Sequence, residues 1–478
     1  PTFHQIDSAS TVNMNVSGTV PLAVYGNLNL NTNATTKTLP ISNTMVTGNL
    51  QVSDQVTLYG STAPNRSTLT VAGDITFHGN SGASPTENQR YALVLEGSTP
   101  HTISVNGTDI ALVSLDAEGS VSFNFNNSNP QNITVGIPSN SGGLTLRPGS
   151  TFNLGQHNLV VNGITGLNGT GEISVSGGNI TIDTHSAQTS SLNFESANYT
   201  INNLSLTNNG SGQFNLANRA ELNNLLTVGT GTTVNMQGDF VLRSTSDAGN
   251  GTARIGPLLN GANIAGNITA ERYMSGEGRI WRYISSPVKD ATVEQLQQSF
   301  PITGNFTVAS TGEGINSGNP SMFSYNETLT PQYQQFPPIG GSNQEILQTG
   351  KGYSAFIRED SLSTTWKVTG VPNQGNITFT LTGNATSNSS LGWNLIGNPY
   401  PASIQWTNGN SGGWTGTGLN GVARVRVNSN GNTQVLTSGV GDWADGIIAP
   451  GQAFWIQTTT ANPALSIQES AKVTTDGA

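Results

Sequence analysis

The sequence predicts an all-β protein: a right-handed parallel β-helix-like solenoid over residues 1–265, then a β-sandwich module with one short helix over residues 266–478. Two observations predict this division. In the first part, short apolar alternations are separated by Asn, Gly, Ser and Thr, and no stretch keeps a helical period. In the second part the composition changes, because all seven tryptophans lie at or beyond Trp281, whereas all five histidines lie at or before His185.

Composition excludes several classes of function. Only 9% of the residues are charged, against roughly 25% in ordinary soluble domains, so neutral side chains must form the polar surface. With 17 Lys and Arg residues, a net charge of −10 and no basic cluster, we expect binding neither to nucleic acid nor to an anionic membrane surface. No apolar run is long enough for a transmembrane helix. The absence of Cys excludes thiolate metal sites and thiol catalysis.

The solenoid is predicted from strands of three to five residues, such as Leu69–Val71, Ile173–Val175 and Leu204–Leu206. Each strand places two apolar residues on one face. Asn recurs beside these strands, where its amide would hydrogen-bond to the coil above. We therefore expect stacked coils of roughly 20–30 residues, with loops at 61–67 and 80–89.

The second part contains one predicted helix, Asp290–Phe300, in which Thr292 and Gln295 have the spacing of a capping box. Pro301 would end this helix. Aromatic and apolar alternation then predicts sandwich strands. These are Gly352–Ile357, Thr365–Val368, Ile377–Leu381, Trp393–Ile396, Val422–Val427 and Phe454–Gln457.

The junction, residues 266–288, should cover the last coil, since an open sheet edge recruits other chains. We expect residues 270–274 and 280–284 to pair around a turn at Ser275–Gly278, with Tyr273 and Trp281 buried.

The segment Asn398–Pro401 (NPYP) is expected to form a rigid corner between two sandwich strands, with a cis Tyr400–Pro401 bond as one option.

Several strings resemble the large cell-surface and secreted β-helix proteins of Bacteroidota that the type IX secretion system exports. The resemblance is dense over residues 220–460. It lies in TARIGP (252–257), GNITAERY (266–273), WRYISSPV (281–288), KGYS (351–354), GVPNQGNIT (370–378), GWNLIGNPYP (392–401) and PGQAFW (450–455).

This resemblance implies an extracellular or outer-surface location, contact with the type IX export machinery, and a role in adhesion or gliding. Such proteins usually end in a secretion-signal domain, and none is recognisable here, so we expect cleavage or further domains beyond Ala478. The same resemblance makes Ser8 and Ser361 candidates for O-glycosylation, because each follows Asp and precedes an apolar residue.

Two pairs of residues are candidates for acid–base catalysis. Asp116 and Glu118 would face the same side of a strand, yet no Lys or Arg is expected nearby, and a solvated turn is favoured. Asp183 and His185 would orient one another as a general base requires, but no nucleophile or metal-ligand spacing accompanies them. We therefore expect no catalytic residue.

No cofactor is expected. Asp442 and Asp445 in DWADG would supply oxygens to Ca²⁺, but the spacing differs from that of an EF-hand loop, and a capped turn is favoured.

Trp406, Trp414 and Trp443 are the candidate ligand-binding residues, because they lie among Gly, Asn, Ser and Asp. Tryptophans in loops can stack on sugar rings, while neighbouring amides bind hydroxyl groups. The alternative is that they cover the sandwich core.

These observations favour an extracellular structural or adhesion protein without catalysis, which binds cell-surface glycans or surface proteins or serves gliding and surface attachment. The alternative is a β-helix carbohydrate-active enzyme, a polysaccharide lyase or hydrolase. An acid pair converging on one groove of the solenoid would favour the enzyme.

Overall fold

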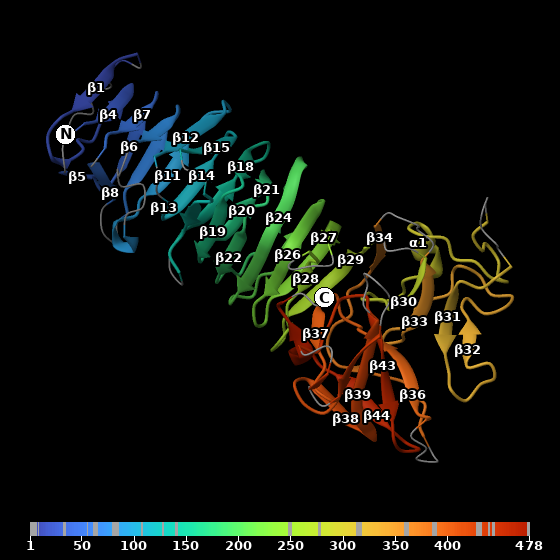
Figure 1. Cartoon of the computed structure of the whole chain (residues 1–478). Coiled ribbons are helices and arrows are strands. Elements are labelled where there is room, and N and C mark those ends of the chain that lie inside the picture. The colour runs from blue at the N-terminus through green and yellow to red at the C-terminus, as the bar shows by residue number, and fades with distance from the viewer. Residues whose placement is uncertain are drawn as a thin grey trace. The chain divides into compact units, whose positions relative to one another are not determined.

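A computed structural model of the chain describes residues 7, 9–31, 35–54, 56–60, 66–78, 86–106, 109–126, 129–138, 142–246, 251–275, 279–311, 318–357, 363–384, 390–426, 433–437, 440–441 and 445–475. These residues are nearly all β: a solenoid of about nine turns, a few antiparallel sheets and one short helix, which confirms the predicted fold class (Figure 1). No helix within these ranges is long and apolar enough to cross a membrane.

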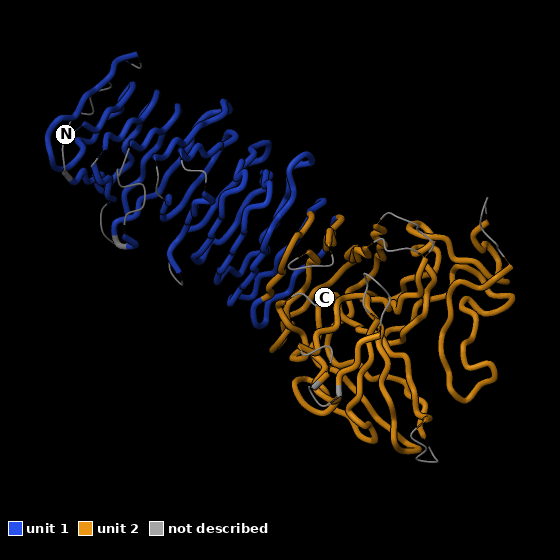
Figure 2. Tube along the Cα trace, in the orientation of Figure 1, with its two compact units in different colours: residues 1–220, 229–238 blue, residues 221–228, 239–478 orange. Residues whose placement is uncertain are grey.

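The chain divides into two compact units (Figure 2). Unit 1 comprises residues 1–220 and 229–238, and unit 2 comprises residues 221–228 and 239–478. The expected junction at residues 266–288 lies within unit 2.

Unit 1 is built from parallel strands stacked coil upon coil. One sheet contains β3 (Val24–Tyr25), β6 (Asn43–Val46), β9 (Thr68–Val71), β11 (Ala92–Leu95), β14 (Ser114–Ala117), β17 (Gly143–Leu146) and β20 (Gly166–Gly169). A small sheet contains β2 (Gly18–Thr19), β5 (Thr35–Thr38) and β8 (Val56–Tyr59). One 3₁₀ turn, Glu87–Gln89, lies between β9 and β11 in the sequence.

The remaining strands of unit 1 form its most extensive sheet. They are β1 (Thr11–Met14), β4 (Asn27–Leu30), β7 (Leu50–Val52), β10 (Ile75–Phe77), β12 (His101–Val105), β13 (Ile110–Leu112), β15 (Val121–Phe125), β16 (Asn132–Val135), β18 (Thr151–Gly155), β19 (Asn158–Gly163), β21 (Glu172–Ser176), β22 (Ile180–Thr184), β23 (Ser190–Leu192), β24 (Phe194–Asn208), β25 (Phe214–Leu216) and the start of β27 (Thr233–Leu242).

The coil length follows from the register of β6, β9, β11, β14 and β17. Val46, Val71, Leu95, Ala117 and Leu146 pair in succession, so adjacent coils are offset by 25, 24, 22 and 29 residues. All five side chains are buried, and they form one column of the solenoid core. The prediction of coils of roughly 20–30 residues is confirmed. The predicted loops at 61–67 and 80–89 lie largely outside the described residues.

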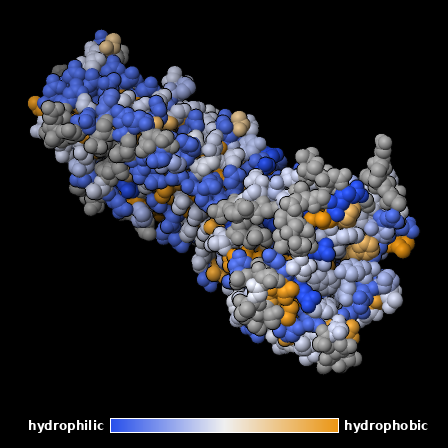
Figure 3. Space-filling view, viewed as in Figure 1, coloured by the Kyte–Doolittle hydropathy of each residue, from blue (hydrophilic) through white to orange (hydrophobic). Residues whose placement is uncertain are grey.

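Asparagine amides bridge successive coils as expected. The Nδ2 of Asn158 donates to Oδ1 of Asn132 at 3.0 Å, Asn179 donates to Asn158 at 2.8 Å, and Asn203 donates to Asn179 at 2.8 Å. These neutral bonds repeat across coils, and the visible face of unit 1 in Figure 3 is mostly hydrophilic. The polar surface is therefore built with few charges.

Unit 2 combines the last coil strands with antiparallel sheets. Its strands β26 (Ala220–Val228) and β28 (Arg254–Ile255) are parallel, whereas β29 (Asn263–Met274) pairs antiparallel with β34 (Thr364–Gly370). One further sheet contains β30 (Ile280–Ile284), β33 (Tyr353–Ile357), β31 (Met322–Tyr325) and β32 (Tyr333–Gln335). The next contains β36 (Trp393–Gly397), β43 (Ala453–Thr458), β39 (Leu419–Arg426), β40 (Thr433–Thr437) and β41 (Val440–Gly441). Two small sheets contain β35 (Ile377–Thr378), β44 (Ala464–Ile467) and β38 (Trp414–Thr417), and β42 (Ile447–Ile448), β37 (Ser403–Gln405) and β45 (Lys472–Val473), respectively.

The predicted pairing of residues 270–274 with 280–284 is wrong. In β29, Met274 pairs with Thr364, and in β30, Trp281 pairs with Phe356. Each strand thus finds a distant partner in place of its neighbour. Tyr273 and Trp281, which were expected to be buried, are only partly buried. The turn at Ser275–Gly278 lies mostly outside the described residues.

The helix α1 (Val293–Gln297) is shorter than expected, and the predicted capping box is wrong. The side chain of Thr292 makes no cap hydrogen bond. The N–H groups of Val293 and Glu294 instead donate to the carbonyls of Glu345 and Asn343. Gln295 pairs with the backbone of Thr369 in β34, donating at 3.1 Å and accepting at 2.9 Å.

The NPYP corner joins β36 to β37. Asn398 is fully buried, and its Nδ2 donates to the carbonyls of Ala402, Ile448 and Ala449 at 2.8, 3.1 and 2.9 Å. Its Oδ1 accepts from the N–H of Tyr400 at 3.0 Å. The option of a cis bond before Pro401 is wrong, because within the described ranges the cis bonds precede Pro331 and Pro337.

Candidate functional site

Aromatic side chains gather on one face of the sheet formed by β30, β33, β31 and β32. Trp281 pairs with Phe356 and Tyr325 pairs with Tyr333, and alternation along the strands places Tyr283 and Phe323 on the same face. The opposite face is core, since Arg282, Ile284, Ala355, Tyr353 and Met322 are buried. One face therefore packs the unit, and the other presents half-buried rings.

The neighbouring sheet supplies further rings and two arginines. Leu395 of β36 pairs with Trp455 of β43, which pairs with Arg424 of β39. Trp393 and Arg426 lie on the same face by alternation. The other face of this sheet faces the core, where Phe454 and Ile456 are buried.

The two faces border a pair of adjoining hollows of about 290 and 310 Å³, which share Tyr283 and Tyr333. We call the pair the aromatic groove. The first hollow is lined by Trp281, Tyr283, Phe323, Tyr333, Ser354 and Arg426. The second is lined by Tyr283, Tyr325, Gln332, Tyr333, Trp393, Arg424, Thr433 and Trp455. Each volume is near the lower end of the roughly 300–1,000 Å³ of small-molecule sites.

The rings of the aromatic groove support one another. The ring centroids of Tyr325 and Trp455 are 4.6 Å apart, those of Tyr325 and Tyr333 are 5.2 Å apart, and those of Trp281 and Phe323 are 5.6 Å apart. Most of these contacts are edge-to-face or tilted, which is a favourable geometry for aromatic pairs. The groove wall is therefore preformed, although its rings remain partly open to solvent.

A tyrosine pair separates the two hollows. Burial raises the pKa of the Tyr333 phenol to about 12, and the neighbouring Tyr283 side chain acts in the same direction. The Tyr333 phenol is therefore neutral near pH 7 and can donate to or accept from a ligand hydroxyl.

Each hollow contains one guanidinium group. Arg424 lies over the Trp393 ring at 4.2 Å from the centroid, and Arg426 lies over the Tyr283 ring at 5.0 Å. Arg426 also donates from Nη1 to the Trp281 carbonyl at 2.9 Å. Among the residues that the structure describes, no carboxylate lines either hollow. Glu327 turns its oxygens to the N–H groups of Gly392 and Trp393.

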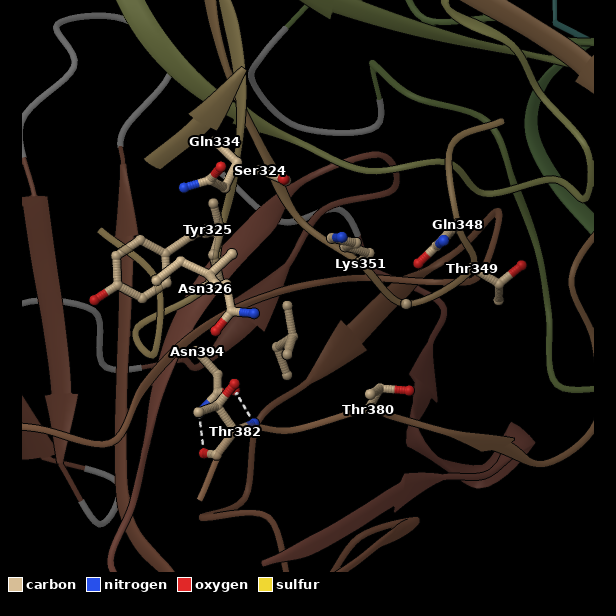
Figure 4. Close-up of a pocket in the computed structure, with 14 residues that line it drawn as sticks. Ser324, Tyr325, Asn326, Gln334, Gln348, Thr349, Lys351, Thr380, Thr382 and Asn394 are labelled. Atoms are coloured by element: carbon tan, nitrogen blue, oxygen red, sulfur yellow. Dashed lines mark hydrogen bonds between the residues drawn. The ribbon is translucent and has the colours of Figure 1, made fainter. Parts of the chain in front are cut away.

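A third cavity of about 280 Å³ adjoins the groove at Tyr325 and is mostly neutral and polar (Figure 4). Lys351 points into it from one side, and Tyr325 and Asn326 lie on the other. Burial lowers the pKa of the Lys351 amine. The amide of Asn394 at its floor is already bound to the backbone of Thr382, donating at 3.0 Å and accepting at 2.7 Å.

Two of the predicted ligand-binding tryptophans lie in the core. Trp406 and Trp414 are each 3% exposed, and their ring centroids are 4.9 Å apart. Both indole N–H groups are satisfied internally: Trp406 donates to the Gly421 carbonyl at 3.1 Å and Trp414 to the Gln405 carbonyl at 2.7 Å. This placement favours the core interpretation over ligand binding.

The other weak candidates lie mostly outside the described residues. These are Trp443, Asp442, Ser8 and Ser361. Asp445 is exposed, and its Oδ1 accepts from the N–H of Ile447 at 3.1 Å, which is the geometry of a capped turn. Within the residues that the structure places, no group of three or more His, Cys, Asp or Glu side chains could hold a metal ion.

The expectation that Asp116 lacks a basic partner is wrong. Arg147 binds it through two bonds, from Nε at 3.0 Å and from Nη2 at 2.9 Å. The pairing arises because β14 and β17 bring segments 31 residues apart onto neighbouring coils. Glu118 is exposed and accepts from the N–H of Gly97 at 3.2 Å. None of the three cavities described above is lined by these residues.

Within the described residues, no hydrogen bond joins the side chains of Asp183 and His185. Asp183 is exposed on β22, whereas Nδ1 of His185 is buried without a hydrogen-bond partner in that part of the chain.

The aromatic groove itself was missed from the sequence. The sequence places Trp393 in a predicted sandwich strand and Trp281 at the junction, without joining them in one site. The signal was present as alternation, since Trp281 and Tyr283 on β30, and Phe323 and Tyr325 on β31, repeat every second residue. What alternation cannot show is that these strands lie next to β39 and β43.

Comparison with known proteins gives one match. The model of the family described as "Domain of unknown function (DUF8693)" matches residues 170–475, which is more than half of the chain. Searches of curated proteins and of solved structures returned no match.

Proposed function

We propose that this chain, a member of the DUF8693 family, is a non-catalytic extracellular cell-surface protein. In this proposal it binds glycans through the aromatic groove of unit 2. Its role is structural or adhesive, in surface attachment or gliding. Its partners are cell-surface glycans, or surface proteins that carry them. The export route in this proposal is type IX secretion in Bacteroidota, which rests on the sequence resemblance alone.

One observation carries the binding proposal. Six half-buried rings and the exposed ring of Tyr333 line two adjoining hollows whose other walls are hydroxyl, amide and guanidinium groups. The C–H face of a sugar ring would cover an aromatic face and remove apolar area from water. Tyr283, Tyr333, Gln332 and Thr433 offer neutral donors and acceptors for sugar hydroxyls.

The solenoid supports the structural part of the role. Its coils are joined by backbone ladders and neutral Asn bonds. Among the described residues of unit 1, few large apolar side chains are exposed: Val16, Ile41 and Ile164. A surface of this kind gives a spacer that stays hydrated with little charge.

The alternative, a carbohydrate-active enzyme on the solenoid, has less support. Both oxygens of Asp116 are held by Arg147, so this carboxylate is engaged as an ion-pair partner. Within the described residues, no second carboxylate is hydrogen-bonded to Arg147 alongside Asp116.

The test is binding of the full chain to a panel of insoluble and arrayed polysaccharides. We expect retention on at least one of them, and loss of that retention in Trp455→Ala and Tyr325→Ala. The matched control is Tyr199→Ala, which removes a tyrosine lying under Arg219 at 5.2 Å in unit 1. Circular dichroism checks folding. Retention that survives both groove variants would contradict the proposal.

A further inference from the structure

We propose that the aromatic groove selects acidic polysaccharide, with one carboxylate-bearing sugar residue in each hollow. This inference rests on the proposed glycan binding and adds the chemical class of the ligand. It starts from charge. The chain has 17 Lys and Arg residues in 478 and a net charge of −10, yet each hollow has a guanidinium, and no described carboxylate lines either one.

The two arginines are positioned as a repeating pair. Arg424 and Arg426 are two residues apart on β39, so both side chains leave the same face of the strand. Their Cα atoms are separated by about 7 Å on an extended strand. Arg424 belongs to the second hollow and Arg426 to the first. A polymer with an acidic group on successive sugars would meet one guanidinium per residue.

Both guanidinium groups are oriented by aromatic rings and keep donors for a ligand. Arg424 is exposed and stacks on Trp393, and the described residues give it no ion pair or hydrogen bond. Arg426 is oriented by Tyr283 and by its bond to the Trp281 carbonyl, while its Nε has no hydrogen-bond partner in the described part of the chain. Stacking leaves the edge of the guanidinium fork free for two parallel bonds to a carboxylate.

Within the described ranges, surrounding acids do not compensate these arginines. The carboxylate beside the groove, Glu327, is directed to the N–H groups of Gly392 and Trp393. The rest of the chain is acidic on balance, which disfavours non-specific attachment of a polyanion elsewhere. Recognition of the acidic polymer is therefore local to the groove, where rings and guanidinium groups occur together.

The test compares three polymers with the full chain: polygalacturonate, the same polymer with its carboxyl groups reduced to alcohols, and polyglutamate of similar charge. We expect binding to polygalacturonate, with binding to the reduced polymer and to polyglutamate weaker by about tenfold or more, since one lacks the charge and the other lacks the sugar ring. Arg424→Gln should weaken polygalacturonate binding by about 10- to 100-fold.

The control is Arg147→Gln, which removes the same charge from unit 1 and should leave binding unchanged. Equal binding of polygalacturonate and its reduced form, unaffected by Arg424→Gln, would overturn the acidic selectivity and leave glycan binding standing. Equal binding of polyglutamate would overturn the sugar class. Failure of both saccharide polymers, together with failure on the wider polysaccharide panel, would overturn the inference and the proposed function together.

Discussion

The guanidinium carbon of Arg424 lies 4.2 Å from the centroid of the Trp393 ring, although the two residues come from different strands, β39 and β36. Between these strands lies β43, whose Trp455 pairs with Arg424. One edge of the aromatic groove is therefore built from three strands of one sheet. This relationship leads to the first prediction.

Arg424→Ala should change stability little. Arg424 is exposed, and an exposed cation–π contact contributes roughly 0.5–1 kcal/mol. We expect the free energy of unfolding to fall by less than about 1 kcal/mol in urea titrations. A larger loss would mean that Arg424 supports the sheet and not the ligand.

Asn398→Ala should destabilise unit 2 strongly. The amide serves three carbonyls and one N–H in a fully buried corner, and each buried group left without a partner costs roughly 1–3 kcal/mol. We expect a loss of at least about 3 kcal/mol, or failure to fold. The control is Asn410→Ala at an exposed position, which should change stability by less than about 0.5 kcal/mol. Similar stability of the two variants would refute the structural role of the corner.

Trp406→Ala separates core packing from ligand binding. The side chain is 3% exposed and packs on Trp414 and Phe454, so its loss should cost about 3–5 kcal/mol. Binding of glycan per folded molecule should stay unchanged below the unfolding transition. The measurement is a titration of the variant with glycan at low temperature, in which the bound amount is divided by the folded fraction. Selective loss of binding in a fully stable variant would restore the ligand-binding interpretation of this tryptophan.

Asp116→Asn should affect neither stability nor any turnover of polysaccharide. The Asp116–Arg147 pair is partly exposed, and such pairs contribute about 0–1 kcal/mol. We expect no reducing ends or unsaturated products from common polysaccharides with the unmodified chain. Turnover that disappears in Asp116→Asn or Asp183→Asn would support the enzyme alternative.

Tyr333→Phe should change the pH dependence of stability above pH 10. The Tyr333 pKa is raised to about 12 in the folded chain, against about 10 in an unfolded one. Between these values the unfolded chain loses the proton while the folded chain keeps it, so stability falls as the pH rises. The stability difference between the unmodified chain and Tyr333→Phe should therefore shrink or reverse from pH 10 to 12. Urea unfolding at several pH values measures it, and a constant difference would contradict the prediction.

Local pattern in the sequence was enough to predict the β class, the coil length and the helix near Val293. Alternating apolar residues such as Leu69 and Val71 require a pleated strand with one buried face, and this requirement does not depend on distant partners. Asn beside each strand similarly predicted the bridges between coils, because each coil repeats the same local environment. These properties follow from neighbours along the chain.

Pairing between distant segments was decided only by the tertiary structure. Residues 270–274 and 280–284 look like a hairpin, but β29 and β30 pair with β34 and β33, since longer ladders and a shared core stabilise more than one short turn. Trp406 and Trp393 show the same limit. Polar neighbours surround Trp406 in the sequence and apolar ones accompany Trp393, yet packing buries the first and leaves the second in a groove. Burial depends on which sheet faces which, and no residue's own neighbours encode that.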